Sequence, residues 1–178
     1  NFELFRTHVA KAMRMMDDII DLELEKVEQI INKVASDPEE EDIRKVEYEL
    51  WKKIKEMALK GRRTGLGITA EGDMLAALGL RYGSDEAIDF AVSVHRTLAV
   101  EAYRASVKMA EERGAFPIYD TEREKGNPMI ERIKEADPEL YAQMEKHGRR
   151  NIAMLTIAPT GTTSLMSQTT SGIEPVFR

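Results

Sequence analysis

Apolar residues recur at every third or fourth position over the first part of the chain. Because an α-helix turns once in 3.6 residues, this spacing places them on one side, and it predicts a long amphipathic helix. The face consists of Phe5, Val9, Ala12, Met13, Met16, Ile20, Val27, Ile30, Ile31 and Val34. The acidic stretch SDPEEED (residues 36–42) then interrupts the period, and we interpret residues 37–42 as a solvated connection.

A second long helix is predicted after this interruption. Asp37 is a good N-cap and Pro38 suits the first helical position, where its missing N–H costs nothing. Gly61 is expected to close the helix, since glycine readily adopts the conformation found past helix ends. The apolar positions that define the helix are Ile43, Val46, Leu50, Ile54 and Met57.

Cap residues divide much of the remaining chain into further helices. A short helix is predicted around residues 73–78, and Ser84 is expected to open the longest helix, which Gly114 ends. Two Pro-containing cap pairs predict two later helix starts, and a glycine ends the second of these helices. These pairs are Asn127–Pro128 and Asp137–Pro138, and the glycine is Gly148. The apolar face of the longest helix includes Ile88, Ala91, Val92, Leu98, Ala102 and Met109.

Two other segments have the pattern of extended chain. RRTGLGIT (residues 62–69) contains two glycines and a short apolar run, which indicates a strand or a tight turn. IAMLTIA (residues 152–158) is a continuous apolar run, and its length favours a buried strand of a parallel sheet. With so few strands, either this strand is a sheet edge or its neighbours lie on chain outside residues 1–178. Because the sequence begins within a helical pattern and ends without a tail, we expect a fragment or a split chain.

Composition excludes several classes of function. The 178 residues carry a net charge of -6, so a broad basic surface for nucleic acid is not expected. The absence of cysteine excludes disulfides, thiolate metal sites and thiol nucleophiles within this sequence. No apolar run approaches the roughly 20 residues of a membrane span, and the amphipathic N-terminus does not resemble a signal peptide. We therefore expect a cytoplasmic protein without a membrane partner.

The hydroxyl-rich stretch APTGTTS (residues 158–164) is the strongest candidate site. It follows the predicted strand and leads into a predicted short helix, whose first N–H groups suit a phosphate. Gly161 has no Cβ, so an anion can approach the backbone closely. The alternative is a helix start capped by hydroxyls and without a ligand, because Thr and Ser are common N-caps. The stretch is not a P-loop, since no Gly-Lys-Thr/Ser follows.

A second candidate is the acidic cluster of Asp17, Asp18 and Asp21, which lie close to one face of the first helix. Such carboxylates bind Mg²⁺ and, through it, a diphosphate, and the cluster resembles the aspartate-rich motif of isoprenoid synthases. A second cluster of that kind is missing, so a polar helix face is the alternative. His95 is expected to be a hydrogen-bonded structural histidine rather than a metal ligand.

Four stretches together resemble the large catalytic subunit of ribonucleotide reductase, and most closely its adenosylcobalamin-dependent class. They are GRRTGLGITAEGDMLAALGLRYGSDEA (61–87), ERGAFP (112–117), RNIAMLTIAPTGTTSLM (150–166) and SGIEPVF (171–177). The resemblance covers nearly the whole chain in the family's order. The stretch 24–60 is longer and more charged than in many members of the family.

The resemblance implies an α/β fold in which this chain is a mainly helical segment of a ten-stranded α/β barrel. Residues 1–60 would be a helical portion, and residues 61–178 would supply barrel strands, helices and the turn that binds substrate phosphate. The residues implied for the phosphate are Pro159, Thr160, Gly161, Thr162, Thr163 and Ser164. The helix that carries Asp17 is structural in the family, which argues against the isoprenoid reading.

The resemblance also implies what the chain lacks. The family abstracts a ribose hydrogen with a cysteine thiyl radical, whereas this sequence contains no cysteine. No catalytic residue and no metal ligand is therefore expected here, and the isolated chain is predicted to be inactive. Its implied partners are a ribonucleotide, the remainder of the reductase barrel and, in the complete enzyme, adenosylcobalamin; a homodimer is left open. The complete enzyme would form 2′-deoxyribonucleotides for DNA replication.

Two other functions stay open at this point. The first is a non-catalytic helical interaction module in which residues 159–164 are only a capped turn. The second is a fragment of a prenyl-diphosphate synthase that uses Asp17, Asp18 and Asp21 with Mg²⁺.

Overall fold

The structure is a computed structural model, which describes residues 1–176. These residues form eight helices and contain no strand longer than a single bridge. The helices are α1 (Phe2–Ala35), α2 (Glu41–Gly61), α3 (Glu71–Ala77), α4 (Asp85–Arg113), α5 (Thr121–Glu124), α6 (Pro128–Ala136), α7 (Pro138–His147) and α8 (Gly161–Ser167). Phe177, the last residue of the fourth family-like stretch, lies outside the described residues.

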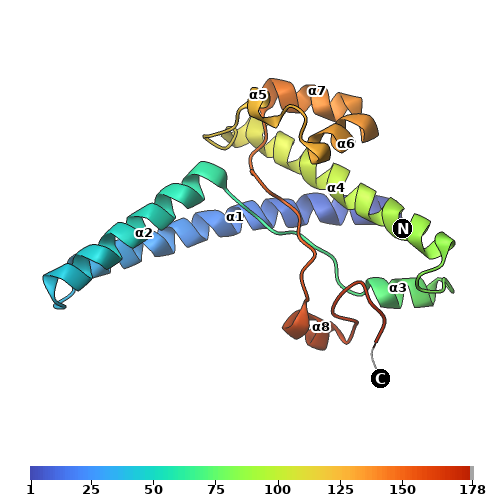
Figure 1. Ribbon diagram of the computed structural model, residues 1–178, viewed down its shortest axis with the longest axis horizontal. Coiled ribbons are helices and arrows are strands. Elements are labelled where there is room, and N and C mark those ends of the chain that lie inside the picture. Colours follow the sequence, from blue (N-terminus) through green and yellow to red (C-terminus); the bar gives the residue numbers. More distant parts are fainter. Residues whose placement is uncertain (177–178) are drawn as a thin grey trace.

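The long helix α1 organises the molecule, because it contacts a different partner along each of its halves (Figure 1). The second half of α1 pairs with α2 to form a projecting arm, and its first half packs against α4. Helices α6 and α7 cover α4 on its other side, whereas α3 and α8 lie together at the opposite end of the molecule (Figure 1). No helix among residues 1–176 is both long enough and apolar enough to cross a membrane.

Most of the predicted helix ends are confirmed by their hydrogen bonds. The side chains of Ser84, Asn127 and Asp137 each accept a backbone N–H in the first turn of the helix that follows. Gly114 and Gly148 end α4 and α7 with positive φ angles of 87° and 72°, a conformation that costs glycine little. These boundaries depend on local chemistry, which is why the sequence predicted them.

Three predictions about helices are wrong. The longest helix is α1 rather than α4. Helix α2 begins at Glu41 rather than at Pro38, so Asp37 is not its N-cap. The backbone oxygen of Asp37 accepts a hydrogen bond from the side chain of Arg44 at 3.2 Å. The left-handed residue that ends α2 is Arg62, with φ 44°, and not Gly61. Gly61 packs closely against Ile152, because a Cβ there would lie 3.2 Å from Cγ2 of that residue.

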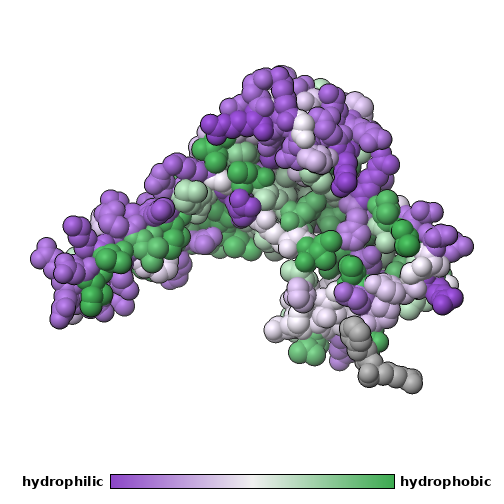
Figure 2. Space-filling model, in the orientation of Figure 1, coloured by the Kyte–Doolittle hydropathy of each residue, from purple (hydrophilic) through white to green (hydrophobic). Residues whose placement is uncertain are grey.

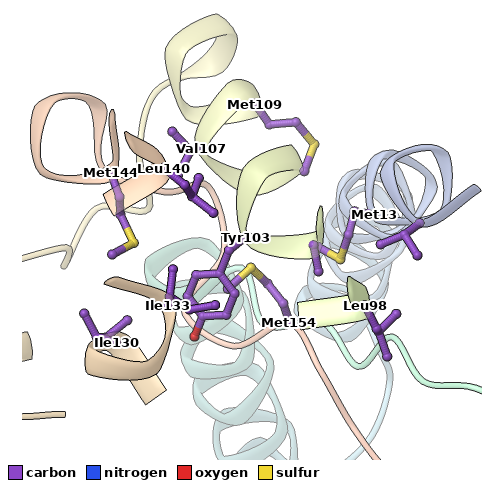
Figure 3. Close-up of a cluster of buried hydrophobic side chains, with 12 residues drawn as sticks. Met13, Leu98, Tyr103, Val107, Met109, Ile130, Ile133, Leu140, Met144 and Met154 are labelled. Atoms are coloured by element: carbon purple, nitrogen blue, oxygen red, sulfur yellow. The ribbon is translucent and has the colours of Figure 1, made fainter. Parts of the chain in front are cut away.

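The core lies where α1, α4, α6 and α7 meet the segment that follows α7. Figure 3 shows the side chains of Met13 of α1, Leu98 and Tyr103 of α4, and Met154 of that segment within one buried cluster. Methionine fills irregular gaps between helices well, because its side chain is long and flexible. The remaining members of this buried cluster are Val9, Ala102, Val107, Met109, Ile130, Ile133, Leu140 and Met144.

The prediction of a buried strand over residues 152–158 requires correction. The segment is extended and runs parallel to residues 61–68, but the two segments share only one bridge, between Leu66 and Leu155. Burial ends at Leu155, and Ile157 is 74% exposed. A parallel strand is buried when strands flank it and helices cover it. Among the described residues only one such neighbour exists, so the apolar run continues into solvent.

Candidate functional site

The candidate turn starts where the extended segment ends, and Thr160 anchors it. The amide of Thr160 donates to the carbonyl of Ser171 at 2.8 Å, and its hydroxyl donates to the same carbonyl at 2.8 Å. The hydroxyl of Thr69 lies 2.8 Å from the hydroxyl of Thr160 and donates to the carbonyl of Thr170 at 2.9 Å. Thr160 therefore fixes the turn in place, and its own amide is not available to a ligand.

The next three residues present their amides to solvent. Gly161, Thr162 and Thr163 form the first turn of α8 and are exposed, and their N–H groups find no acceptor among the described residues. No atom lies within 4 Å of the position that a Cβ of Gly161 would take, so the backbone is open to approach there. The hydroxyls of Thr162 and Thr163 also lack a hydrogen-bond partner within the part of the chain that the structure describes.

The two outer members of the predicted set have different roles. Pro159 is exposed and has no N–H group to offer. Ser164 is buried; its amide donates to the carbonyl of Thr160 at 2.7 Å, and its hydroxyl donates to the carbonyl of Gly161 at 2.8 Å. Both donors of Ser164 are thus used within the turn. The structure brings all six residues together, but only residues 161–163 present free amides.

Sequence reasoning did not identify the residues that support this turn. The carboxylate of Asp73 in α3 accepts the amide of Thr170 at 2.7 Å, and the amide of Ala70 donates to the carbonyl of Thr170 at 3.0 Å. Gly72 packs against the backbone of Glu174, because a Cβ there would lie 2.6 Å from its carbonyl oxygen. The start of α3 therefore holds residues 170–174 beside the turn. The family-like GDML sequence (residues 72–75) was the available signal.

Two glycines before α3 let the extended segments approach closely. A Cβ on Gly67 would lie 2.7 Å from the carbonyl oxygen of Thr156, and a Cβ on Gly65 would lie 3.3 Å from Cγ2 of the same residue. The amides of Thr64 and Leu66 donate to the carbonyls of Ala153 and Met154 at 2.9 and 2.7 Å. The GLG sequence therefore serves close packing of the segment that leads into the turn.

The acidic cluster on α1 lies apart from the candidate turn and, unlike the exposed amides of the turn, it includes a buried charged residue. Asp17 is fully buried, and its carboxylate accepts hydrogen bonds from Arg62 at 2.8 Å and Asn151 at 3.0 Å, and from Arg113 and Arg150 at 3.3 Å. Burial alone would raise the pKa of Asp17, but the hydrogen bond and charge of Arg62, with Asn151 and Arg150, lower it below its ordinary value. Asp17 is therefore an ionised structural group.

This environment does not suit a divalent cation. One oxygen from each of Asp17, Asp18 and Asp21 lies within 4.8 Å of the others, which would allow shared coordination. However, Arg62 forms an ion pair with Asp21 at 2.8 Å, and Arg113 forms one with Asp18 at 2.8 Å. With the arginines already neutralising these carboxylates, a Mg²⁺ ion would meet like charges. The prediction of a polar helix face is also incomplete, because Asp17 is the centre of a buried network.

The residues before the extended segment belong to this network. Asn151 donates to Asp17 and to the carbonyl of Arg62, both at 3.0 Å, and accepts from the hydroxyl of Ser106 at 2.9 Å. Arg149 is buried, pairs with Glu124, and lies 5.3 Å from the ring centre of Phe116. Sequence reasoning missed both residues as structural centres. Their partners are far away in the sequence, so no local pattern identified them.

Each of the three histidines has a protein partner. Nε2 of His95 lies 2.8 Å from the carboxylate of the buried Glu71, which confirms the prediction that His95 is hydrogen-bonded. Nδ1 of His8 lies 2.7 Å from the carbonyl of Leu4, and His147 lies 4.0 Å from Glu111. Within residues 1–176 the histidines do not gather into a metal site.

An open groove lies beside the free edge of the extended segment. It has a volume of about 710 Å³ and is lined by α4, α6 and residues 155–157. Apolar side chains make up much of its wall, including Leu98, Ile133 and Leu155. The groove adjoins the same segment that leads into the candidate turn.

Comparison with known proteins places these features in a family context. The family model described as "Ribonucleotide reductase, barrel domain" matches residues 1–178. A vitamin B12-dependent ribonucleoside-diphosphate reductase of Mycobacterium tuberculosis is 38% identical over 122 residues, which cover 68% of this chain and 15% of the relative. The protein of the same name from Thermoplasma acidophilum is 34% identical over 178 residues, which cover 99% of this chain and 18% of the relative. A ribonucleoside-diphosphate reductase subunit alpha of Treponema pallidum is 30% identical over 125 residues, 66% of this chain and 14% of the relative. The chain thus spans less than a fifth of the length of these relatives.

Proposed function

The chain belongs to the ribonucleotide reductase barrel-domain family, and from this premise we propose that its turn at residues 159–164 binds the phosphate of a ribonucleotide. The complete enzyme would be an adenosylcobalamin-dependent reductase that converts ribonucleotides into 2′-deoxyribonucleotides. The observation that carries the proposal is the set of three free, exposed amides at residues 161–163.

These amides are suited to an oxyanion for electrostatic reasons. The first N–H groups of a helix have no partner within the helix, and the aligned peptide dipoles give that end a partial positive charge. A phosphate oxygen can accept several such N–H groups at once, and the missing side chain of Gly161 lets it approach the backbone. The exposed hydroxyls of Thr162 and Thr163 add donors. An anion is therefore the ligand class that the turn favours.

The support of the turn reduces the cost of ordering it on binding. Thr160 is tied to Ser171, and Thr170 is tied to Asp73, so two loops and the start of α3 hold one another. Ser164 closes the first turn of α8 from inside through its bonds to Thr160 and Gly161. Donors that are fixed before binding lose little conformational entropy when the ligand arrives. This arrangement favours a ligand site over a turn that is merely capped.

Substrate and cofactor are assigned from the relatives. Their names specify ribonucleoside diphosphates and vitamin B12, so we propose a ribonucleoside diphosphate as the substrate of the complete enzyme. Adenosylcobalamin would supply the radical. We propose that the cofactor binds other parts of the complete enzyme, because the open donors found in this chain suit a small oxyanion. The sequence also contains no cysteine, so the reacting thiols would come from other parts of the enzyme.

The remainder of the reductase barrel is the proposed partner of this segment. The parallel pair of extended segments has free edges, and the 710 Å³ groove with its apolar wall lies beside one of them. A free strand edge presents unpaired N–H and C=O groups, which favours pairing with further strands. We therefore propose that residues 61–68 and 152–158 are neighbouring strands of the complete barrel.

Replacing Gly161 tests the phosphate assignment. A Gly161→Val substitution has room in the fold and would place a branched side chain where the anion approaches. In the complete reductase, we expect the dissociation constant for a ribonucleoside diphosphate to rise at least tenfold, with hydrogen exchange of the core helices unchanged. Calorimetric titration of the nucleotide measures this change.

A matched control is Thr163→Val, which keeps the amide and the shape of the side chain but removes the hydroxyl. It should weaken binding much less, because the amides carry the interaction. If Gly161→Val binds the nucleotide as tightly as the parent enzyme does, the phosphate assignment is wrong and a capped turn is left. Mg²⁺-dependent binding that is lost in an Asp18→Asn variant, whose carboxylate is half-exposed, would instead favour the prenyl-diphosphate interpretation.

A further inference from the structure

A pair of polar side chains ties the start of α3 to α4. The carboxylate of Glu71, the first residue of α3, lies 2.8 Å from Nε2 of His95 in α4. Glu71 is only 6% exposed, and among residues 1–176 its carboxylate has no other hydrogen-bond or ion-pair partner. Burying a carboxylate is costly unless a partner compensates for the lost hydration. Glu71 therefore depends on His95 to stay where it is.

Little apolar packing supports this end of the molecule. Among the described residues, no member of α3 or α8 belongs to the buried hydrophobic cluster of the core. On the face shown in Figure 2, the surface around α8 is mainly of intermediate hydropathy, whereas hydrophobic residues gather on the arm formed by α1 and α2. An open pocket of about 350 Å³ separates the start of α3 from parts of α1 and α4, and Glu71 belongs to its wall. The polar pair therefore connects α3 to α4 where apolar packing is sparse.

The backbone beside Glu71 is in a conformation that needs support. Ala70, which directly precedes α3, has a φ angle of 64°, in the left-handed region. This conformation is unfavourable for a residue with a Cβ, and it persists only where neighbouring contacts hold it. On one side, the amide of Ala70 donates to the carbonyl of Thr170 at 3.0 Å. On the other side, Glu71 is held by His95, so the strained residue is fixed from both directions.

The residues around Glu71 hold the phosphate turn. The hydroxyl of Thr69 contacts the hydroxyl of Thr160 and the carbonyl of Thr170, and the carboxylate of Asp73 accepts the amide of Thr170. Thr160 is the N-cap residue of α8 and directly precedes its free amides. A displacement of the start of α3 would therefore displace the contacts that fix the turn.

We propose that Glu71 and His95 are positioning residues for the phosphate turn: their contact fixes the start of α3, which in turn holds Thr160 and Thr170. Neither side chain is assigned a contact with the nucleotide. The inference rests on the phosphate assignment at residues 161–163, and it extends the site to a helix that does not adjoin the turn in sequence.

Removing the imidazole of His95 tests this role in the complete reductase. His95→Leu keeps apolar bulk on α4 but leaves the carboxylate of Glu71 buried without its partner. We expect the KM for a ribonucleoside diphosphate to rise about fivefold or more and kcat to change less than about twofold, because the turn holds the phosphate equally in the ground state and the transition state. Steady-state kinetics measures both constants. Hydrogen exchange of residues 168–175 should also become faster.

A conservative variant and a matched control accompany this test. In His95→Gln, the glutamine amide can donate from nearly the position of Nε2, so the KM should stay within about twofold of the parent value. His147→Leu removes a histidine that lies 4.0 Å from Glu111 at the end of α7, and it should change neither the KM nor the exchange of residues 168–175. If His95→Gln raises the KM as much as His95→Leu does, the hydrogen bond to Glu71 is not responsible and the proposal is wrong.

A double variant tests whether the two residues act through one contact. Glu71→Leu and His95→Leu each remove the same interaction, so the double variant should raise the KM no further than the larger single effect. An apolar pair also leaves no buried charge without a partner. Single effects that multiply in the double variant would show that the residues act independently, which overturns the proposal.

The outcomes separate this proposal from the phosphate assignment. If Gly161→Val weakens nucleotide binding while His95→Leu leaves the KM unchanged, the turn binds phosphate without help from the pair, and the positioning role is wrong. If Gly161→Val leaves binding unchanged, the phosphate assignment fails. The positioning role then fails with it, even if His95→Leu accelerates the exchange of residues 168–175.

Discussion

The segment of residues 149–163 connects two regions with opposite polar character. At its start, Arg149, Arg150 and Asn151 are held by a buried network in which Asp17 alone accepts hydrogen bonds from four side chains. At its end, the amides of residues 161–163 are exposed and have no acceptor among the described residues. The first region fixes the segment, and the second offers donors to something outside it.

The two ends of the segment differ in how freely their polar groups can change partners. A buried charge is tolerated only when it is paired and hydrogen-bonded, so the network around Asp17 has little freedom to change. Exposed amides are solvated by water, and an incoming anion can replace that water without disturbing the core. Stability and ligand binding are therefore expected to respond to substitutions at different ends of the same segment.

The largest expected effect is at the buried end. Asp17→Asn removes the buried negative charge that Arg62, Arg113 and Arg150 share. Arg62 and Arg113 keep one carboxylate each, Asp21 and Asp18, but Arg150 loses its ion pair. Breaking one partner of a buried pair costs about 3 kcal/mol or more. We expect faster hydrogen exchange in peptides covering residues 149–156 of the complete enzyme, measured by mass spectrometry. Asp18→Asn is the control, because Asp18 is half-exposed, and an equal effect there would contradict the central role of Asp17.

Lowering the pH should destabilise the buried end of the segment in the same way as Asp17→Asn, without any substitution. The pKa of Asp17 is lowered in the folded state from its ordinary value of 3.8, so its contribution is fully present above that value. The contribution is lost as the pH falls further through the folded-state pKa. Exchange of residues 149–156, corrected for its intrinsic pH dependence, should be flat above about pH 5 and rise below pH 4. The Asp17→Asn variant should lack this acid-dependent rise; if it keeps it, another group is responsible.

The contrast between the ends also explains which features the sequence could predict. Ser84, Asn127 and Asp137 cap helices through residues two or three positions away, so a local pattern was enough. The hydroxyl-rich turn was found because Gly161 and its neighbours form one short stretch. Asp17 was recognised as part of a cluster, but its partner Asn151 is 134 residues away, and no local pattern joins them.

The failed prediction at residues 152–158 shares its cause with an exposed apolar face on α2. The run 152–158 was predicted as a buried strand, yet Ile157 is exposed, and Ile43, Val46, Leu50 and Met57, which helped to predict α2, are exposed as well. Periodicity shows which side of an element is apolar, but it does not show which element covers that side. In both places the described residues supply no cover, which agrees with a chain that spans less than a fifth of its relatives. The patterns therefore identified the apolar side of each segment correctly, but they did not show whether another element covers that side.

The smallest expected effect is at the support of the open end, where Thr69→Val removes one hydroxyl. Thr69 donates to the carbonyl of Thr170, but that carbonyl also accepts from the amide of Ala70, and the hydroxyl of Thr160 keeps its bond to Ser171. Loss of one such hydrogen bond costs about 1 kcal/mol. In the complete enzyme we expect the affinity for a ribonucleoside diphosphate to fall only a few-fold, with faster hydrogen exchange confined to residues 168–175. Thr97→Val removes a comparable hydroxyl on α4 and should change neither quantity. If Thr69→Val instead accelerates exchange in residues 149–156, the two ends are coupled, and the separation between a fixing end and a binding end does not hold.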